Sequence, residues 1–360
     1  MVSRFFYLLI FFLLLSVGLF SQSDTTKSRQ ILVFPIITKS IENGWSFGSM
    51  AAMIFRLSPK DTVSRTSNLE ILGLYSTKKQ LVTVVNGTQY FDKEKYILSE
   101  QVSFSSYPDK FWGLGQKSPD TAIEAYKFDQ YYVYAHLLRK VADHLFVGVL
   151  YERQEVWDID YTAGGIFDKE NILGRKGYIV DGVGASFTYD TRNNAFSPDR
   201  GFFGQIYFNH FDKFWGSDYN YNNLFIDLRK YLPLPNHQVL ALQLFSFYNS
   251  GEVPLRSLAA FGGASRMRGY YEGRYKDLQQ MVFQTEYRFP IYKRLKGVAF
   301  GGAGSVANHF SDYSIPQLKY SFGGGLRFAL SEKERLNLRL DYGVGQAGNS
   351  GFYIQLGEAF

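Results

Sequence analysis

The sequence contains no cysteine among its 360 residues. This absence excludes disulfide bonds, thiolate metal sites and thiol nucleophiles, because each of them needs a cysteine sulfur. It leaves the redox state of the compartment undetermined. Histidine is scarce as well, and the five histidines are scattered without an HExxH motif or an i,i+4 pair that would bring two rings to one metal ion. We therefore expect no metal site and no cofactor.

Long hydrophobic runs are missing after the first 22 residues. A transmembrane helix needs roughly 20 consecutive apolar residues, and the mean hydropathy is −0.17, so a bundle of such helices is excluded. The net charge of +6 is spread without a Lys/Arg block, which argues against a nucleic-acid partner. A GxSxG match at residues 44–48 follows a hairpin turn instead of joining a strand to a helix, so we predict no enzyme.

The one long hydrophobic run lies in a segment with the layout of a signal peptide. Arg4 stands in a short leading region, and the apolar residues 5–15 and several small residues follow it. The run is too short for a comfortable membrane span, although an N-terminal anchor helix is the alternative interpretation. We predict a signal peptide over residues 1–22 and a short periplasmic segment over 23–30, with export across the inner membrane.

Aromatic residues and glycine are abundant. Phe, Tyr and Trp make up 18% of the chain, and there are 34 glycines. This composition excludes a disordered chain, because large aromatic side chains bury apolar surface. It fits many twisted strands joined by turns. It also supplies the two girdles of aromatic residues that a membrane β-barrel places at the membrane surfaces.

Polarity alternates along the chain with the period of a β-strand. In residues 337–344, Leu338, Leu340 and Tyr342 share one face, opposite Asp341. Successive strand side chains point to opposite faces, so this pattern predicts one apolar and one charged face. The same alternation recurs in residues 183–190 and 281–289. Apolar residues outward and polar residues inward are typical of a membrane barrel.

Turn residues divide the chain from residue 31 onward into about sixteen strands. We place them near residues 31–39, 45–57, 66–76, 79–91, 95–106, 123–139, 144–155, 178–191, 202–211, 219–231, 237–248, 280–290, 297–307, 318–330, 334–344 and 351–360. Even-numbered connections are mostly short and several odd-numbered ones are long, as in barrels with periplasmic turns and extracellular loops. The prediction is an all-β, antiparallel transmembrane barrel over residues 31–360, in the outer membrane of a Gram-negative cell.

The chain ends in GFYIQLGEAF, which reads as a barrel strand. Four residues of it are predicted to share one face and to form a C-terminal recognition strand: Phe352, Ile354, Leu356 and Phe360. Such a strand resembles the signal read by the bacterial outer-membrane insertion machinery. A strand in the core of a soluble domain is the alternative interpretation.

Three stretches resemble the barrel of the bacterial surface antigen superfamily, which contains BamA, TamA and two-partner-secretion translocators. The first, YDTRNNAFSPDRGFF, is similar to a periplasmic-turn motif through Asp190, Arg192, Asn193, Pro198 and Gly201. The second, RMRGYYEGRYKD, is similar to the motif of the long sixth extracellular loop through Arg268, Gly269 and Tyr270. The third runs through EYRFP, FGGAG, SFGGGLRF and LRLDYG at residues 286–343.

The resemblance implies that the sixth loop folds into the lumen and that Arg268 binds carboxylates on the inner wall. Arginine suits this role because its charge is permanent and its planar fork fits a carboxylate. Glu286 is inward by strand alternation and lies at the matching position. The second carboxylate of the family would fall near Gly302, where none is present, so we consider Asp341 as its substitute. A solvated loop arginine is the alternative.

The resemblance also implies a function, with one departure. BamA-like proteins carry periplasmic POTRA domains, and we expect none here, because roughly ten polar residues separate the leader from Ile31. We expect non-enzymatic assistance of protein insertion or translocation, by opening between the first and last strands. The expected partners are outer-membrane lipid and lipopolysaccharide, unfolded outer-membrane or secreted clients and a separate periplasmic protein. A passive channel or structural barrel is the alternative.

Overall fold

A computed structural model describes residues 29–58, 61, 64–331 and 335–360. The predicted signal peptide over residues 1–22 lies outside the described residues, as does most of the predicted segment over 23–30. Arg29 and the residue after it already belong to the first strand, which begins two residues earlier than predicted. No helix in the described part of the chain is both long and apolar enough to cross a membrane.

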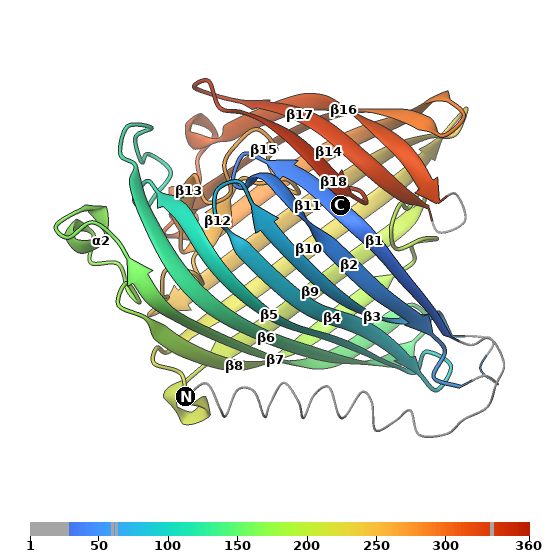
Figure 1. The fold of residues 1–360 in the computed structure, drawn as a ribbon, viewed down its shortest axis with the longest axis horizontal. Helices are drawn as coiled ribbons and strands as arrows, with labels where there is room; N and C mark the ends of the chain where they lie inside the picture. The colour runs from blue at the N-terminus through green and yellow to red at the C-terminus, as the bar shows by residue number, and fades with distance from the viewer. Residues whose placement is uncertain (1–28, 59–60, 62–63, 332–334) are drawn as a thin grey trace.

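Sixteen strands form one closed antiparallel barrel, in agreement with the number predicted from the sequence (Figure 1). They are β1 (Arg29–Ser40), β2 (Gly44–Phe55), β3 (Ser67–Ser76), β4 (Leu81–Phe91), β5 (Tyr96–Phe111), β6 (Glu124–Ala142), β7 (Leu145–Asp160), β8 (Tyr178–Asp190), β9 (Gly201–Phe211), β10 (Tyr221–Leu234), β11 (Gln238–Gly251), β14 (Gln279–Tyr292), β15 (Leu295–Ala307), β16 (Lys319–Ser331), β17 (Leu336–Gly345) and β18 (Ser350–Leu356). Each strand pairs with its sequence neighbour, and β1 meets β18.

The predicted alternation is present in the barrel wall. On β17 the outward Tyr342 is 52% exposed, whereas the inward Asp341 is 0% exposed. On β14 the outward Phe283 is exposed and the inward Glu286 is fully buried. The apolar face of these strands therefore looks toward lipid and the charged face toward the lumen, as in other membrane barrels.

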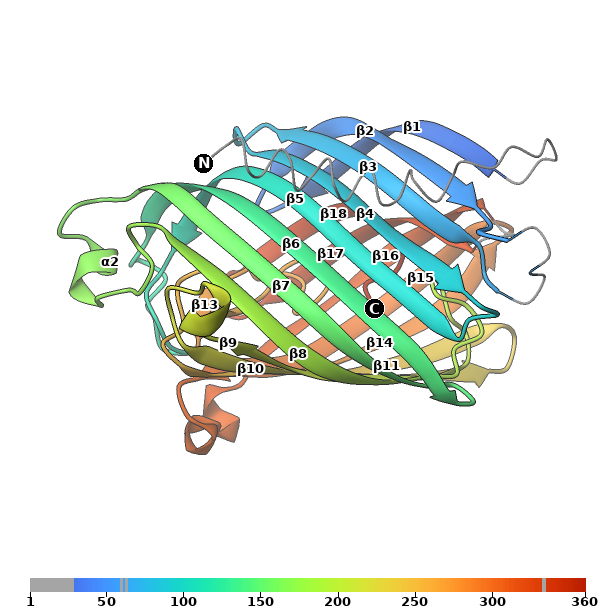
Figure 2. The ribbon, with the colours of Figure 1, turned by 90° about the horizontal axis from the view of Figure 1, so that it is seen from below.

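β5 and its neighbours are longer than the sequence predicts. β5 extends to Phe111, past Pro108, where a loop is predicted. The ladder with β4 already ends at Leu81 opposite Ser106, so the missing N–H of Pro108 interrupts no hydrogen bond on that side. Figure 2 shows α2 (Ile166–Lys169) at the end of the barrel toward which β7 and β8 extend. This end is extracellular by the order of long and short connections.

A hydrophobic cluster fills the lumen at the extracellular end. Phe111, Phe167 and Phe211 are each 0% exposed, and Leu255 of the sixth loop packs against them. Inward-facing side chains of the long strands and the α2 segment thus form an apolar cap. The lumen below this cap holds the loop that carries the candidate site.

The sixth extracellular loop, residues 252–278, connects β11 to β14 and includes a small hairpin. Its strands are β12 (Ala259–Phe261) and β13 (Tyr275–Asp277), which pair in antiparallel fashion. Phe261, Met267 and Tyr270 of this loop are at most 1% exposed. Burial this complete, in a loop joined to strands on both sides, places the loop inside the barrel.

Candidate functional site

The tip of the sixth loop can approach the barrel wall closely because of Gly269. This residue has φ +109°, a conformation open to glycine and strained for other residues. A Cβ atom here would lie about 3 Å from backbone atoms of Gly343 and Gly345 on β17. The barrel wall itself has a glycine at both of these positions of β17, so no side chain stands between it and the loop. The RGY motif is therefore a place where loop and wall meet backbone to backbone.

Arg268 forms ion pairs with both carboxylates that the sequence suggested. Its Nη2 lies 2.6 Å from Glu286 Oε1, and its Nη1 donates to Asp341 Oδ2 at 2.6 Å. The three side chains are at most 1% exposed. A buried charge requires such partners, because solvation by water is lost. The guanidinium thus fixes the loop to β14 and β17 together.

The wall of β15 explains why the second family carboxylate can be absent. Gly302 faces the lumen, and a Cβ there would lie 3.1 Å from Met267 Sδ. The guanidinium carbon of Arg268 lies 3.5 Å from the ring centroid of Phe300, so an aromatic face covers this side of the charge. Apolar side chains therefore occupy the space beside Gly302, and Asp341 supplies the negative charge from β17.

Four charged residues of the site were not singled out from the sequence: Arg288, Arg327, Arg339 and Glu358. Arg327 donates to Asp341 Oδ1 at 2.5 Å and to Glu358 Oε2 at 2.7 Å. Arg288 donates to Glu286 Oε2 at 2.9 Å. Strand alternation places the three arginines inward, so this signal was present in the sequence. Which of these charged groups pair with one another depends on the positions of the sixth loop and the C-terminal tail. Strand alternation does not predict those positions.

Arg339 is the least satisfied member of this cluster. Its Nε lies 3.8 Å from Asp341 Oδ2, and its Nε and Nη1 have no hydrogen-bond partner among the described residues. Its side chain is 3% exposed. The cluster joins four arginines to three acidic side chains, so positive charge is in slight excess. Each carboxylate is therefore shared by at least two guanidinium groups.

Tyr270 and Gly269 tie the loop to the last strands. The Gly269 N–H donates to the Tyr353 hydroxyl at 2.9 Å. The Tyr270 hydroxyl donates to the Tyr320 carbonyl oxygen at 3.0 Å and accepts from the Gln346 N–H at 2.7 Å. Burial of the hydroxyl raises the pKa of Tyr270 to about 12. The loop is thus attached to β16, to β18 and to the turn between β17 and β18.

The predicted periplasmic-turn residues form a compact turn between β8 and β9. Asp190 accepts two hydrogen bonds from the Arg192 guanidinium, both at 2.9 Å. Asn193 donates to Asp199 across the turn at 2.7 Å. Gly201 has φ +111°, and a Cβ there would lie 2.4 Å from the Thr191 oxygen. This geometry shows a structural role for the motif.

Pro198 of the same turn lies against the charged cluster. Its carbonyl oxygen accepts from Arg288 Nη1 at 3.5 Å. The neighbouring Ser197 donates to Glu358 Oε1 at 3.2 Å. The periplasmic turn and the C-terminal tail are therefore in direct contact, which the sequence did not reveal.

The C-terminal strand differs from its prediction. β18 ends at Leu356, and Gly357 with φ +80° turns the chain away from the strand. Phe360 does not share the outward face of Phe352 and Ile354. It is 5% exposed and packs in the lumen with a cluster that includes Tyr231. The expected common face is therefore corrected, because Glu358 is held inside by Arg327 and draws the tail with it.

The seam between β1 and β18 is the least paired junction of the barrel. In the described residues of both strands, the register consists of Lys39 opposite Ile354 alone. The adjacent ladder between β17 and β18 runs from Leu338 opposite Leu356 to Val344 opposite Ser350. Figure 1 shows β1 in blue beside β18 in red. Most of the backbone edge of β1 therefore lacks a strand partner on this side.

Metal chemistry finds no support in the described ranges, where no group of three or more His, Cys, Asp or Glu side chains could hold an ion. The charged groups around Arg268 instead pair with one another. The arrangement is suited to positioning a loop and a strand edge.

Residues 65–360 match the family model described as the Omp85 superfamily domain. No curated protein matches the chain. The match begins within the turn before β3 and covers the sixth loop, the charged cluster and the C-terminal strand. Well over half of the chain is therefore included.

Solved structures agree in fold. The chain is similar to BamA from Haemophilus ducreyi lacking POTRA domains 1–3, with 16% identity, a TM-score of 0.62 and coverage of 93% of this chain and 71% of that one. It is also similar to CdiB from Acinetobacter baumannii, with 12% identity, a TM-score of 0.56 and coverage of 92% and 60%. CdiB from Escherichia coli gives 9% identity, a TM-score of 0.57 and coverage of 93% and 63%. The chain thus spans about three fifths of each CdiB.

The similar solved structures support the fold, and the match to the family model shows the family. The strand number, the RGY loop and the charged cluster fit that relationship. The chain belongs to the Omp85 superfamily, and it is an outer-membrane β-barrel.

Proposed function

We propose that this barrel assists the insertion of proteins into the outer membrane, or their translocation across it, without enzymatic chemistry. The mechanism is separation of β1 from β18. The observation that carries the proposal is the seam, where Lys39 opposite Ile354 is the single register pair in the described strands. Parting the two strands at this junction breaks fewer backbone hydrogen bonds than parting any other pair.

An opened seam exposes backbone groups that another strand satisfies. Unpaired N–H and C=O groups are costly in lipid, so an edge strand in the membrane is a template for strand addition. A client segment entering from the periplasm would pair with this edge by β-augmentation. Its residues would then leave water with their backbone groups already paired. The partners of this reaction are unfolded outer-membrane or secreted proteins, delivered by a separate periplasmic protein.

The contacts of the sixth loop indicate which side of the seam moves. The loop holds β17 through Asp341 and β18 through Tyr353. On the other side, Lys39 of β1 places its Nζ 5.4 Å from the ring centroid of Phe352, an exposed contact between side chains. On the β1 side the loop reaches only the β1–β2 turn, where the Glu272 N–H donates to Glu42 Oε1 at 2.8 Å. The β18 side has more contacts with the loop, and we infer that β1 is the strand that swings away.

Two disulfides that share one cysteine position provide the test. Lys39→Cys with Ile354→Cys locks the seam, whereas Leu340→Cys with Ile354→Cys locks β17 to β18, which the mechanism does not separate. The chain has no native cysteine, so each crosslink is specific. Cells depleted of the native protein are complemented with each variant, and other outer-membrane and secreted proteins are quantified by proteomics.

We expect the seam-locked variant to assemble and yet fail to restore the client proteins, and the control variant to restore them. Full activity of a completely crosslinked seam would reject lateral opening. If depletion lowers no other barrel and no secreted protein, the chain is a passive channel or a structural barrel for a partner.

A further inference from the structure

One carboxyl group lies on the lipid-facing side of the barrel wall. Ile71 of β3 is exposed to lipid, and Leu69, two residues earlier, shares its face. The register continues this face from Leu69 to Gly87 of β4 and from Gly87 to Glu100 of β5. The lipid-facing residues of a barrel form an apolar band, and an ionisable side chain within a membrane is a candidate functional site.

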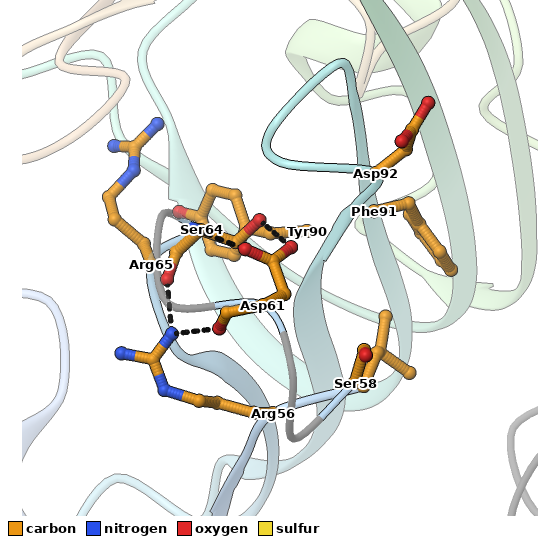
Figure 3. A pocket seen from close by; sticks show the side chains of 9 residues that line it. Arg56, Ser58, Asp61, Ser64, Arg65, Tyr90, Phe91 and Asp92 are labelled. Carbon is orange, nitrogen blue, oxygen red and sulfur yellow. Dashed lines mark hydrogen bonds between the residues drawn. The ribbon is translucent and has the colours of Figure 1, made fainter.

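Glu100 lies near the middle of the membrane. Two aromatic residues share its face on β5, Tyr96 toward the periplasm and Phe104 toward the outside. Each of them is four residues away, which corresponds to about 10 Å along the barrel axis, at a rise of about 3.3 Å per residue and a tilt of about 40°. Figure 3 shows Arg56 and Asp92 at the periplasmic ends of β2 and β4, outside this band.

The hydrogen-bonding capacity of this carboxyl group is only partly used. Glu100 Oε1 accepts a hydrogen bond from Gln89 Nε2 at 2.5 Å, whereas Oε2 is buried with no hydrogen-bond partner among the described residues. The Oε1 atom of Gln89 has no donor within the described ranges. Lipid chains offer no hydrogen bonds, so these oxygens stay unpaired unless a second protein surface meets them.

Small residues flank this pair of side chains. Glu100 lies opposite Gly87 on one side and opposite Ala135 of β6 on the other. A Cβ at position 87 would lie 2.8 Å from both Glu100 Oε1 and Gln89 Nε2, so glycine lets the pair lie against the wall. Contacts between protein surfaces in membranes are enriched in small residues and in polar side chains that hydrogen-bond across the interface. We call Gly87, Gln89, Glu100 and Ala135 the lipid-facing patch.

We propose that the lipid-facing patch is the contact between two copies of this chain in the outer membrane. Copies with the same orientation hold Glu100 at the same depth, and a two-fold axis along the membrane normal brings identical patches together. Another protein would need a matching polar residue at that depth.

The hydrogen bonds of the patch are self-complementary. A charged carboxylate is costly in hydrocarbon, so Glu100 is the neutral acid there. Its O–H donates to the free Gln89 oxygen of the other copy once both side chains turn outward from the wall. The two-fold axis forms the same bond a second time in the opposite direction. Each copy thus supplies one donor and one acceptor.

This contact goes beyond the proposed insertion function and does not depend on it. β2 and β3 separate the patch from β1, so the seam between β1 and β18 still faces lipid. Ile71 and Leu137, which lie beside the patch, are 52% and 43% exposed. These apolar side chains pack between the two copies and add contact area around the hydrogen bonds.

Cysteine crosslinking in outer membranes tests the proposal. Leu98→Cys and Val102→Cys place a thiol on either side of Glu100, close to the two-fold axis. Leu326→Cys is the control, because Leu326 is exposed on the lipid face of β16, across the barrel from β5. The chain has no native cysteine, so a disulfide between two copies joins identical positions. Copper phenanthroline, which enters the membrane, is the oxidant, and heat-modifiable migration verifies folding.

We expect a severalfold higher yield of disulfide-linked dimers from Leu98→Cys and Val102→Cys than from Leu326→Cys. Adding Glu100→Leu, which suits lipid and leaves the barrel folded, should lower the yield to that of the control. Glu100→Gln should keep it, because an amide also donates and accepts. Equal yields at all three positions, or dimers that survive Glu100→Leu, would overturn the proposal. The readout requires no client, so its failure leaves the proposed insertion function untouched.

Discussion

The lumen wall of β14–β17 and that of β1–β4 follow the same alternation of strand side chains and have opposite chemistry. The first presents Glu286, Arg288 and Asp341, all at most 6% exposed and engaged in ion pairs. The second presents half-buried aliphatic side chains such as Leu72 and Val84. Strand alternation determines which residues face the lumen, but it does not determine whether those residues are charged or apolar. One wall holds the sixth loop through ion pairs, and the aliphatic side chains of the other form none.

The two walls also meet at the seam between β1 and β18, where their contacts with the sixth loop differ. β18 is attached through the loop and the charged cluster, whereas the loop reaches the β1–β2 hairpin at its turn, where the Glu272 N–H donates to Glu42 Oε1. In the proposed opening, the charged wall is the fixed half of the barrel and the apolar wall is the half that moves. Four changes test this division, from the largest expected effect to the smallest.

Removing Arg268 should break the fixed half. Arg268→Ala leaves Glu286 and Asp341 buried with less compensation, at a cost of about 3–5 kcal/mol in the free energy of unfolding. Glu286→Ala should also be costly, and the double variant should cost less than the sum of the two single ones, since both remove the Arg268–Glu286 ion pair. The readouts are the midpoint of heat-modifiability and protease cleavage within residues 252–278.

Arg266→Ala is the matched control for Arg268. Arg266 is half-buried two residues before it, and its guanidinium carbon lies 3.9 Å from the Phe245 ring centroid, with no ion pair to any described residue. We expect a smaller loss of stability and no increase in loop cleavage. Strictly additive effects of Arg268→Ala and Glu286→Ala would show that other contacts hold the loop.

A pair of lysines on β3 should separate the two faces of the movable half. Ile71→Lys places a charge on the lipid side and should cost about 2–4 kcal/mol of unfolding free energy in vesicles. Leu72→Lys, one residue further, should cost less, because its ammonium group can reach Glu70 in the lumen. Urea unfolding in vesicles measures both variants, and equal losses would contradict the assignment of faces.

Truncating Phe360 should weaken the link between the tail and the fixed half. Phe360→Ala exposes part of the cluster with Tyr231 and Val239, so we expect a loss of roughly 1.5–3 kcal/mol and a lower level of assembled protein. Phe360→Leu keeps most of the apolar contact and serves as the control. Normal assembly and an unchanged unfolding midpoint for Phe360→Ala would show that the tail contacts add little.

The smallest effect concerns Lys276 in the sixth loop. Burial lowers the pKa of this lysine to about 8, so the folded protein releases the proton at a pH where the unfolded chain still holds it. Stability should therefore rise between pH 8 and pH 9, by about 1 kcal/mol. Lys276→Met should remove this increase. A pH dependence that is the same in both proteins would assign it to another group.

The sequence predicted the features that local patterns control. Sixteen strands and the inward position of Glu286 follow from alternation and turn residues. Arg268 and its two carboxylates came from a family resemblance, and the structure places all three together. Pro108 lacks a backbone N–H and therefore favoured a loop. β5 nevertheless continues past it, because the neighbouring strand has already ended. Whether a proline interrupts a ladder depends on the adjacent strand, which local sequence does not contain.

The remaining features depend on contacts between distant segments. Glu358 interrupts the apolar face of the last strand in the sequence, and this polarity was the only sign that the tail turns inward. Its partners Arg327 and Asn337 lie on β16 and β17. The pairing of Leu72 with Val84 on the lumen side of β3 and β4 was equally hidden, because both look like ordinary strand residues until the register places them side by side. Chemistry of this kind is a property of the closed barrel.

The inward turn at Gly357 has a consequence for the order of folding. Glu358 accepts a hydrogen bond from Ser197 across 161 residues, and Phe360 packs on Tyr231 and Val239 in the middle of the chain. Contacts between such distant residues must overcome the loop-closure entropy of everything between them, so they form after the intervening strands have paired. The C-terminal tail therefore packs late in folding, on a surface to which several strands contribute. A fluorophore next to Phe360 would follow barrel completion in time, separately from the growth of the sheet.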